Sequence, residues 1–154
     1  MGPSQSDPDL DRVAEQIGKQ VAEAEAVLVC GGLGGAMESA CRGAARAGGM
    51  TIGILPGHER ADANRWVAIA VPTGLGELRN ALIVRTADVI IALGGGYGTL
   101  SEIALALRLG VPVVGVGTWD LVEPNADRVP AIVRTEAESA VSTALGLSGR
   151  LSVE

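Results

Sequence analysis

The stretch VIIALGGGYGTLSE, residues 89–102, decides the fold. Residues 89–93 form an apolar run rich in β-branched side chains, which is typical of a buried strand. Residues 94–99 are rich in glycine, and residues 100–109 carry Leu and Ala at helical spacing up to Gly110, a helix-ending residue. A buried strand, a glycine turn and a helix in this order predict half of a parallel βαβ unit.

The same order of elements occurs nearer the start of the chain. Residues 26–30 are a short apolar run, residues 31–35 form a second glycine-rich turn, and residues 36–47 have a helical pattern. A strand over residues 50–55 follows. Ahead of this unit, Pro8 occupies the first helical position after a polar N-cap, which predicts a helix to about residue 25.

Alternating elements continue along the rest of the chain. We expect a polar loop over residues 58–65, a strand over 66–71, a helix over 77–86, a strand over 111–116 and a helix over 136–145. This alternation predicts an α/β fold with a Rossmann-like, doubly wound parallel sheet in a single domain, residues 1–154. Ligands of such sheets bind at the carboxyl ends of the strands, where both glycine turns lie.

Composition excludes several classes of function. The net charge is −6 and aromatic residues are 2% of the chain, which argues against binding of a nucleic acid polymer. No apolar run approaches the roughly 20 residues of a membrane span, and no leader pattern precedes the first helix, so we expect no membrane association and a cytoplasmic location. Cys30 and Cys41 lack metal-ligand spacing; we interpret them as reduced packing residues and predict no metal site.

Two glycine turns before helices indicate a small phosphate-bearing ligand. Backbone N–H groups in such turns approach a phosphate closely, and the helix N-terminus adds partial positive charge. The predicted contacts are Gly31, Gly32, Gly34 and Gly35 in the first turn and Gly95, Gly96, Tyr97, Gly98 and Thr99 in the second. The alternative is that the glycines only make tight turns in a non-binding module. Neither turn completes the ATPase or NAD-dehydrogenase fingerprint.

Two charged residues are candidates for chemistry. Arg79 falls in the first turn of a predicted helix, where it opposes the helix dipole and needs either an anionic partner or solvent. Glu102 follows Thr99 at capping-box spacing, so its carboxylate has two readings: a backbone cap or a group that faces a ligand. Asn64 and Asn80 are weaker candidates for polar contacts.

These residues resemble the LOG-like proteins of the SLOG superfamily, formerly labelled lysine decarboxylases. Arg79, Asp88 and residues 95–102 are similar to the arginine and the PGGxGTxxE signature of LOG proteins, and residues 31–37 are similar to GGGxxGLM. The similarity is closest to the branch with the molybdenum cofactor carrier protein, through ANxxV at 63–67, PTGLGExRN at 72–80 and GGGYGTLSEIALAL at 94–107. The resemblance adds Met37 and Thr73 to the expected ligand contacts.

The resemblance implies two functions. One is a carrier that binds a nucleotide or a molybdopterin-type ligand, with the molybdenum cofactor as the carried molecule. The other is a phosphoribohydrolase that cleaves nucleoside 5'-monophosphates, with Arg79 and Glu102 as catalytic residues. Gly94 replaces a proline and Asn80 a lysine of the LOG enzymes, which favours the carrier. Lys19 is the only lysine and lies far from both turns in sequence, so a pyridoxal phosphate decarboxylase is disfavoured.

The resemblance also implies a homodimer or larger homo-oligomer, and a β-strand at the start of the fold. Residues 1–4 match the loop that follows that strand. We therefore expect a sheet without its central first strand, a native start upstream of Met1 or a shortened chain, and low stability in its absence.

Overall fold

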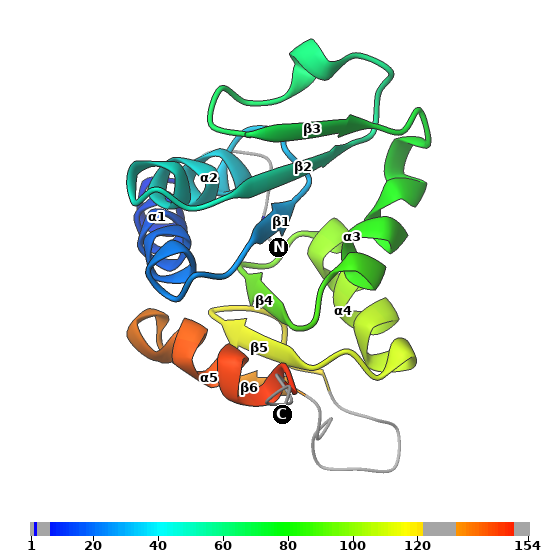
Figure 1. Cartoon of the computed structure of the whole chain (residues 1–154). Helices are drawn as coiled ribbons and strands as arrows, with labels where there is room; N and C mark the ends of the chain where they lie inside the picture. The colour runs from blue at the N-terminus through cyan, green and yellow to red at the C-terminus, as the bar shows by residue number, and fades with distance from the viewer. Residues whose placement is uncertain (1, 3–6, 122–131, 150–154) are drawn as a thin grey trace, which may run out of the picture.

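A computed structural model describes residue 2, residues 7–121 and residues 132–149 (Figure 1). Its strands form two three-stranded sheets in which every pair of neighbours is parallel. The first sheet contains β1 Leu28–Cys30, β2 Thr51–Leu55 and β3 Ile69–Pro72. The second contains β4 Ile90–Leu93, β5 Val113–Val116 and β6 Ile132–Arg134.

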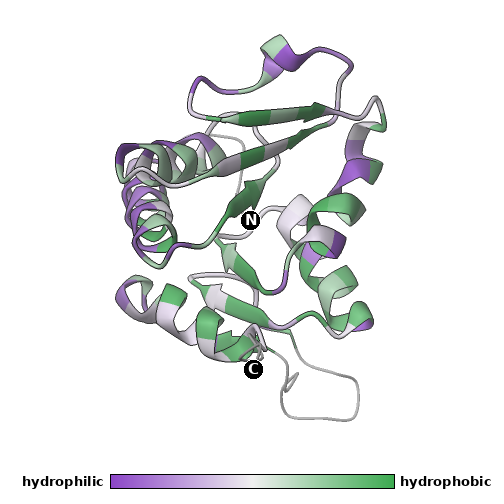
Figure 2. Ribbon diagram, in the orientation of Figure 1, coloured by the Kyte–Doolittle hydropathy of each residue, from purple (hydrophilic) through white to green (hydrophobic). Residues whose placement is uncertain are grey.

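Helices cover both faces of the two sheets. The helices are α1 Pro8–Glu23, α2 Ala36–Arg46, α3 Asn80–Thr86, α4 Tyr97–Leu109 and α5 Ala140–Leu147. Figure 1 shows α1, α2 and α5 on one side of the strands and α3 and α4 on the other. The strands are mostly hydrophobic and the outward faces of α1 and α2 hydrophilic (Figure 2), as expected for a covered parallel sheet. The predicted Rossmann-like α/β class is confirmed.

Strand β1 forms one edge of the first sheet and β4 forms one edge of the second. No described strand lies between these two edges. The expectation of a sheet without a central strand therefore agrees with the structure. Buried side chains of α1, α5, β4 and β5 form one apolar cluster across the division, and side chains of α3, α4, β4 and β5 form another. The core thus continues past a point where main-chain pairing stops.

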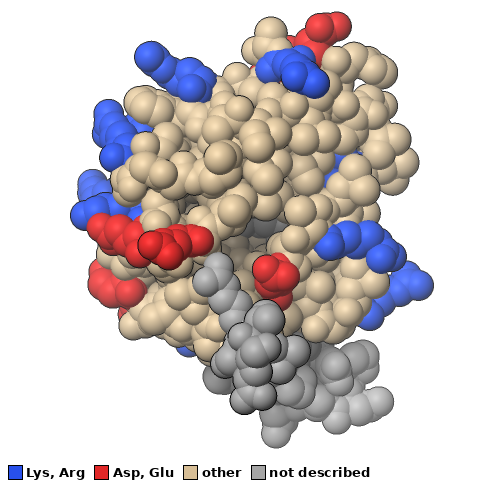
Figure 3. Space-filling view, in the orientation of Figure 1, with Lys and Arg blue, Asp and Glu red and all other residues tan. Residues whose placement is uncertain are grey.

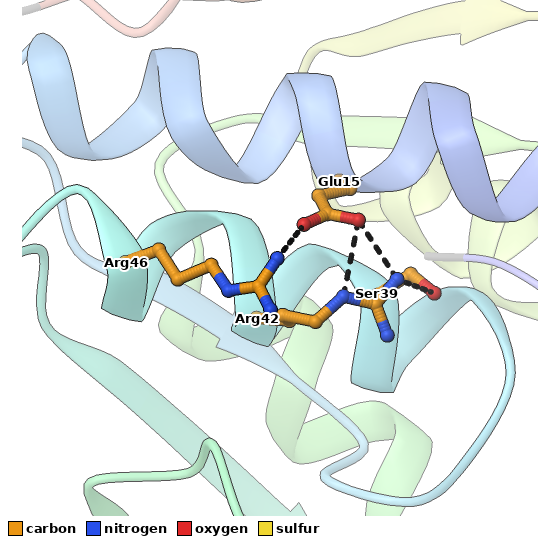
Figure 4. Close-up of polar contacts among 4 residues, drawn as sticks. All are labelled: Glu15, Ser39, Arg42 and Arg46. Atoms are coloured by element: carbon orange, nitrogen blue, oxygen red, sulfur yellow. Dashed lines mark hydrogen bonds and ion pairs between the residues drawn. The ribbon is translucent and has the colours of Figure 1, made fainter.

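Helices α1 and α2 approach closely because glycines face the partner backbone. A Cβ atom built at Gly18 would lie 2.0 Å from Ala40 O, and one at Gly43 would lie 2.0 Å from Glu15 O. Beside this contact, Glu15 accepts hydrogen bonds from Arg42 and Arg46 of α2 (Figure 4). The hydrogen bond from Arg42 is the main cause of a lowered pKa at Glu15.

Several predicted boundaries differ from the structure. Helix α4 begins at Tyr97, not at residue 100, and β3 begins at Ile69, not at 66. The Trp66 ring instead lies beside the guanidinium groups of Arg46 and Arg65, 5.4 and 5.3 Å from its centre. Strand β6 was not predicted. None of the helices in the described residues combines the length and apolar character needed to cross a membrane.

Candidate functional site

The first glycine loop, residues 31–35, follows β1 and is tightly enclosed. Gly31 and Gly32 are buried, and a Cβ atom at Gly32 would lie 2.9 Å from the Cα atom of Gly53 in β2. Gly32 also has a φ of 72°, which favours glycine. The Asn64 amide donates hydrogen bonds to Gly32 O and Leu33 O, at 3.2 and 3.0 Å. Backbone packing and Asn64 therefore hold this loop in place.

The second glycine loop, residues 94–96, follows β4 and is less enclosed than the first. Gly95 is exposed, and no atom within 4 Å would meet a Cβ at Gly96 or at Gly98 in the first turn of α4. The Trp119 indole N–H donates a hydrogen bond to Gly96 O at 3.2 Å. Gly94 has a φ of 67°, which proline cannot adopt because its ring holds φ near −65°. The departure from the LOG pattern at Gly94 thus corresponds to a different turn.

The helices after both loops begin without a side-chain cap. Gly35 is the N-cap of α2 and Gly96 that of α4, and neither helix start has a hydrogen bond from a capping side chain. By contrast, Asp7 caps α1 by accepting from the N–H groups of Asp9 and Leu10. Two helix starts at the carboxyl ends of strands thus retain backbone donors and partial positive charge for an anion.

Arg79 is buried beside the first loop. It ends the 3₁₀ helix η2 Gly76–Arg79 and immediately precedes α3, and only 7% of its surface is exposed. A Cβ atom at Gly31 would lie 2.5 and 2.6 Å from the two Nη atoms, so the guanidinium rests directly on that glycine. Its Nε atom has no hydrogen-bond partner within the described part of the chain. The reading of Arg79 as a solvated surface residue is therefore wrong.

Glu102 is buried on α4 and carries a charge opposite to that of Arg79. The predicted capping box is wrong, because Gly96 is the N-cap and Thr99 already lies in the first turn. Burial raises the pKa of Glu102, and the attraction of Arg79 opposes that rise. Burial lowers the pKa of Arg79, and Glu102 opposes that change in turn. The site thus combines a partly desolvated cation with a carboxyl group that is more easily protonated than in water.

Other predicted residues fall around the same edge. The Thr73 hydroxyl donates to Leu55 O at 2.7 Å, so it fixes the end of β2. The Met37 sulfur lies against Gly31, where a Cβ would approach it to 2.7 Å. Thr99 is buried, Gly34, Gly35 and Asn80 are half-buried, and Tyr97 is 83% exposed beside Trp119, with ring centres 5.9 Å apart. Asn64 and Thr73 support the loops through bonds to backbone.

A contact between the two cysteines was missed by sequence reasoning. Cys30 and Cys41 are free and buried, as interpreted, but their sulfur atoms lie 3.4 Å apart. The hydrogen bond between the two sulfur atoms lowers the pKa of Cys30 to about 7, and the Gly32 N–H donates a hydrogen bond to the Cys30 sulfur. Their separation along the chain, from the end of β1 to the middle of α2, carries no pairing signal.

Comparison with known proteins places these features in a family. Residues 1–144 match the family described as SLOG cluster4. An uncharacterized protein of Archaeoglobus fulgidus is 40% identical over 116 residues, which are 75% of this chain and 76% of that protein.

Two solved structures share the fold over nearly the whole chain. The molybdenum cofactor binding protein of the phototrophic bacterium Rippkaea orientalis is 37% identical, with a TM-score of 0.85 and coverage of 95% of this chain and 93% of that one. The molybdenum cofactor carrier protein of Chlamydomonas reinhardtii is 32% identical, with a TM-score of 0.84 and coverage of 97% and 96%. The resemblance found in the sequence is confirmed.

Proposed function

The chain belongs to the SLOG cluster4 family, and from this premise we propose that it is a carrier for a phosphate-bearing small molecule, either a nucleotide or a molybdopterin-type cofactor. The ligand phosphate binds at the edge where β1 and β4 end, against Gly95, Gly96, Gly98 and Thr99. Arg79 neutralises its charge. Carriage needs affinity and release but no catalytic group.

The burial of Arg79 is the observation that carries this proposal. Removal of a guanidinium from water has a high free-energy cost unless an anion and hydrogen-bond acceptors replace the water. Glu102 is the anion that acts on Arg79, and burial weakens its tendency to ionise. The Arg79 Nε still lacks an acceptor among the described residues. A bound phosphate would supply both the negative charge and the acceptor.

The uncapped helix starts support the same ligand class. Backbone N–H groups of the first turns of α2 and α4 have no side-chain acceptor, and helix N-termini attract phosphates. The open space above Gly96 and Gly98 leaves room for the phosphate to approach the backbone of the second loop. The exposed ring of Tyr97 offers a face for the base or pterin ring.

The relatives favour a pterin-type ligand over a simple nucleotide. Proteins named for molybdenum cofactor binding or carriage are 37% and 32% identical to this chain and match it over almost its full length. We propose the molybdenum cofactor as the carried ligand on this ground. In this proposal Gly95, Gly96, Gly98 and Thr99 hold the phosphate of the cofactor, and Tyr97 offers a face to its ring.

Glu102 favours a second candidate, a nucleoside 5'-monophosphate phosphoribohydrolase. Its carboxyl is buried, is not a helix cap and has a raised pKa, which are properties of catalytic carboxyl groups. Arg79 would hold the 5'-phosphate while Glu102 stabilises the positive charge on the sugar or activates water. Water adds at the anomeric carbon, the N-glycosidic bond breaks, and base and ribose 5-phosphate leave.

One experiment distinguishes the carrier function from the hydrolase function. Purified protein, Glu102→Ala and the exposed-site control Glu77→Ala are incubated with a panel of nucleoside 5'-monophosphates, and free base is measured chromatographically. Molybdenum cofactor binding is measured in parallel by retention through gel filtration. Retention by all three proteins without base release supports the carrier. Base release that disappears only in Glu102→Ala supports the hydrolase. If the proteins neither retain the cofactor nor release base, both functions are contradicted.

We also propose that the protein is a homo-oligomer. Leu75 just before η2, Leu78 in η2 and Leu82 in α3 are exposed, with Leu78 exposed over 78% of its surface. Such an apolar stripe is typical of a surface that a second copy covers. Light scattering should give a mass above that of one chain for the native protein and a monomer for Leu78→Glu. A native monomer would contradict the proposal.

A further inference from the structure

The turn after β5 contacts the second glycine loop at both of its ends. The Thr118 hydroxyl donates a hydrogen bond to Gly94 O at 2.5 Å, and the Trp119 indole N–H donates one to Gly96 O at 3.2 Å. Strand β5 lies beside β4, so the turn and the loop follow neighbouring strands. We propose that Thr118 and Trp119 are positioning residues: they fix the loop so that two of its backbone N–H groups face the ligand. This role rests on the phosphate binding proposed above.

The direction of the two carbonyl groups sets the direction of two N–H groups. The described residues contain no cis peptide bond, and in a planar trans peptide the C=O group and the N–H group of the next residue point in opposite directions. The carbonyl groups of Gly94 and Gly96 point toward the turn after β5. The N–H groups of Gly95 and Tyr97 therefore point away from that turn. Neither N–H has an acceptor in the described part of the chain, so both are available to an anion.

The same hydrogen bonds restrict a loop that is otherwise flexible. A run of three glycines has more backbone freedom than any other sequence of this length, and ordering it on binding would weaken the affinity. The Gly94 N–H donates to the backbone of β5 at 3.3 Å, and Gly96 O accepts from the Leu100 N–H at 3.0 Å. A carbonyl oxygen has two lone pairs, so Gly96 O can accept from Leu100 and Trp119 together. The loop is thus ordered before a ligand arrives.

Arg134 of β6 holds the turn after β5 in place. Its guanidinium donates hydrogen bonds to the backbone oxygen atoms of Thr118 and Trp119, and it forms an ion pair with Asp120 at 2.8 Å. The Trp119 ring packs against the buried apolar cluster of α3, α4, β4 and β5. It also lies beside the Tyr97 ring, with ring centres 5.9 Å apart. One tryptophan therefore supports both the phosphate donors and the exposed ring face.

Backbone direction matters here because the surrounding side chains add little positive charge. Figure 3 shows the Lys and Arg side chains of one face of the molecule spread along its margins, without a single basic patch among the coloured residues. The positive charge of Arg134 is matched by Asp120. Backbone N–H groups that point the same way form an anion site by themselves. The second loop therefore depends on the hydrogen bonds that orient it.

The test removes one donor at a time and preserves the shape of the side chain. Thr118→Val loses the hydroxyl, Trp119→Phe loses the indole N–H, and Thr118→Ser keeps the hydroxyl. Thr86→Val and Trp66→Phe are the matched controls, because the Thr86 hydroxyl donates to a carbonyl within α3 and Trp66 precedes β3. Each protein is titrated with inorganic phosphate and with guanosine 5'-monophosphate while its backbone amide NMR signals are followed. Urea midpoints are measured for all variants.

Both probes should shift the amide signals of Gly95 and Tyr97 in the native protein. Thr118→Val and Trp119→Phe should each weaken binding about threefold to tenfold, because each loses one orienting hydrogen bond. They should also reduce the two amide shifts at saturation, since the N–H groups no longer hold one direction. Thr118→Ser and the two control variants should bind and shift as the native protein does.

Several outcomes would overturn the positioning role. Native affinity and native shifts in Thr118→Val and Trp119→Phe would contradict it directly. Weaker binding with unchanged amide shifts at saturation, matched by the controls at equal urea midpoint, would show that the two residues serve stability alone. If the probes shift other amides of the native protein but not those of Gly95 and Tyr97, phosphate binding stands and the positioning role fails. If neither probe shifts any amide, phosphate binding itself fails, and the role fails with it.

Discussion

The two glycine loops have similar sequences and equivalent places in the fold, but glycine serves different purposes in them. In the first loop, Gly32 has a positive φ and lies against the Gly53 backbone, so a side chain has neither a relaxed conformation nor space. In the second, Gly96 at the end of the loop and Gly98 in the following first turn of α4 have open space around them. Gly96 also has ordinary extended dihedral angles, which any residue adopts.

This difference separates packing from ligand binding. Glycine in the first loop is required by the protein's own backbone, whatever the loop binds. No neighbouring atom in the described chain requires glycine at positions 96 and 98. The lack of a side chain at these positions leaves room for a molecule outside the chain. The second loop is therefore the better guide to function, and substitutions in the two loops should affect different measurements.

The largest effect is expected from Gly32→Ala, with a loss of about 2–4 kcal/mol in the free energy of unfolding from backbone strain and overpacking. Gly48→Ala is the matched control, since Gly48 has a φ of 80° but no atom within 4 Å of a new Cβ. It should lose only about 1–2 kcal/mol, the cost of the left-handed conformation for alanine. Urea unfolding measures both, and equal losses would contradict a role for the contact with Gly53.

Arg79→Gln should weaken binding of the phosphate ligand about tenfold to a hundredfold, because a charge-assisted contact is lost. Arg85→Gln, on the exposed side of α3, is the charge-matched control and should bind normally. Isothermal titration with the best ligand from the panel above measures the affinity. Normal affinity in Arg79→Gln would mean that the buried cation serves only the fold.

Gly98→Ala should separate the second loop from the first. Alanine favours a helix over glycine, so stability should rise by about 0.5–1 kcal/mol, whereas the methyl group in the open space should reduce ligand affinity about threefold to tenfold. Gly146→Ala in α5 also has free space and should raise stability without a change in affinity. Unchanged affinity in Gly98→Ala would remove the second loop from the proposed phosphate site.

The smallest effect is expected in the pH dependence of stability at Glu102. Because burial raises its folded-state pKa, the native state binds the proton more tightly than the unfolded chain does, and stability is lost as pH rises through that pKa. Glu102→Gln should therefore be more stable than the native protein near pH 7, with a difference that fades below pH 4.5. Urea midpoints between pH 4 and 8 test this, with Glu77→Gln as control. A pH-independent difference would contradict it.

The local sequence pattern was sufficient to predict the strands and helices in which an apolar run is bounded by glycine or proline. The strands before both glycine loops and the helix after Pro8 agree with prediction to within a few residues, because burial requires apolar side chains and turns require glycine. Strand β6 was missed because three residues, one of them Arg134, carry too little pattern. Trp66 and Val67 resembled the start of a strand, yet the Thr51 side chain bonds the backbone of Trp66 and Ala68, and pairing begins only at Ile69.

The amino-acid sequence by itself determined the α/β class, the family resemblance and the position of two glycine loops at one sheet edge. Only the tertiary structure decided that Arg79 is buried against Gly31, that Glu102 is not a helix cap, and that the six described strands form two separate sheets. Periodicity and turn preferences reflect forces between near neighbours in the chain. Burial, charge pairing and free space depend on segments that meet only after folding, and these properties decide what the site can bind.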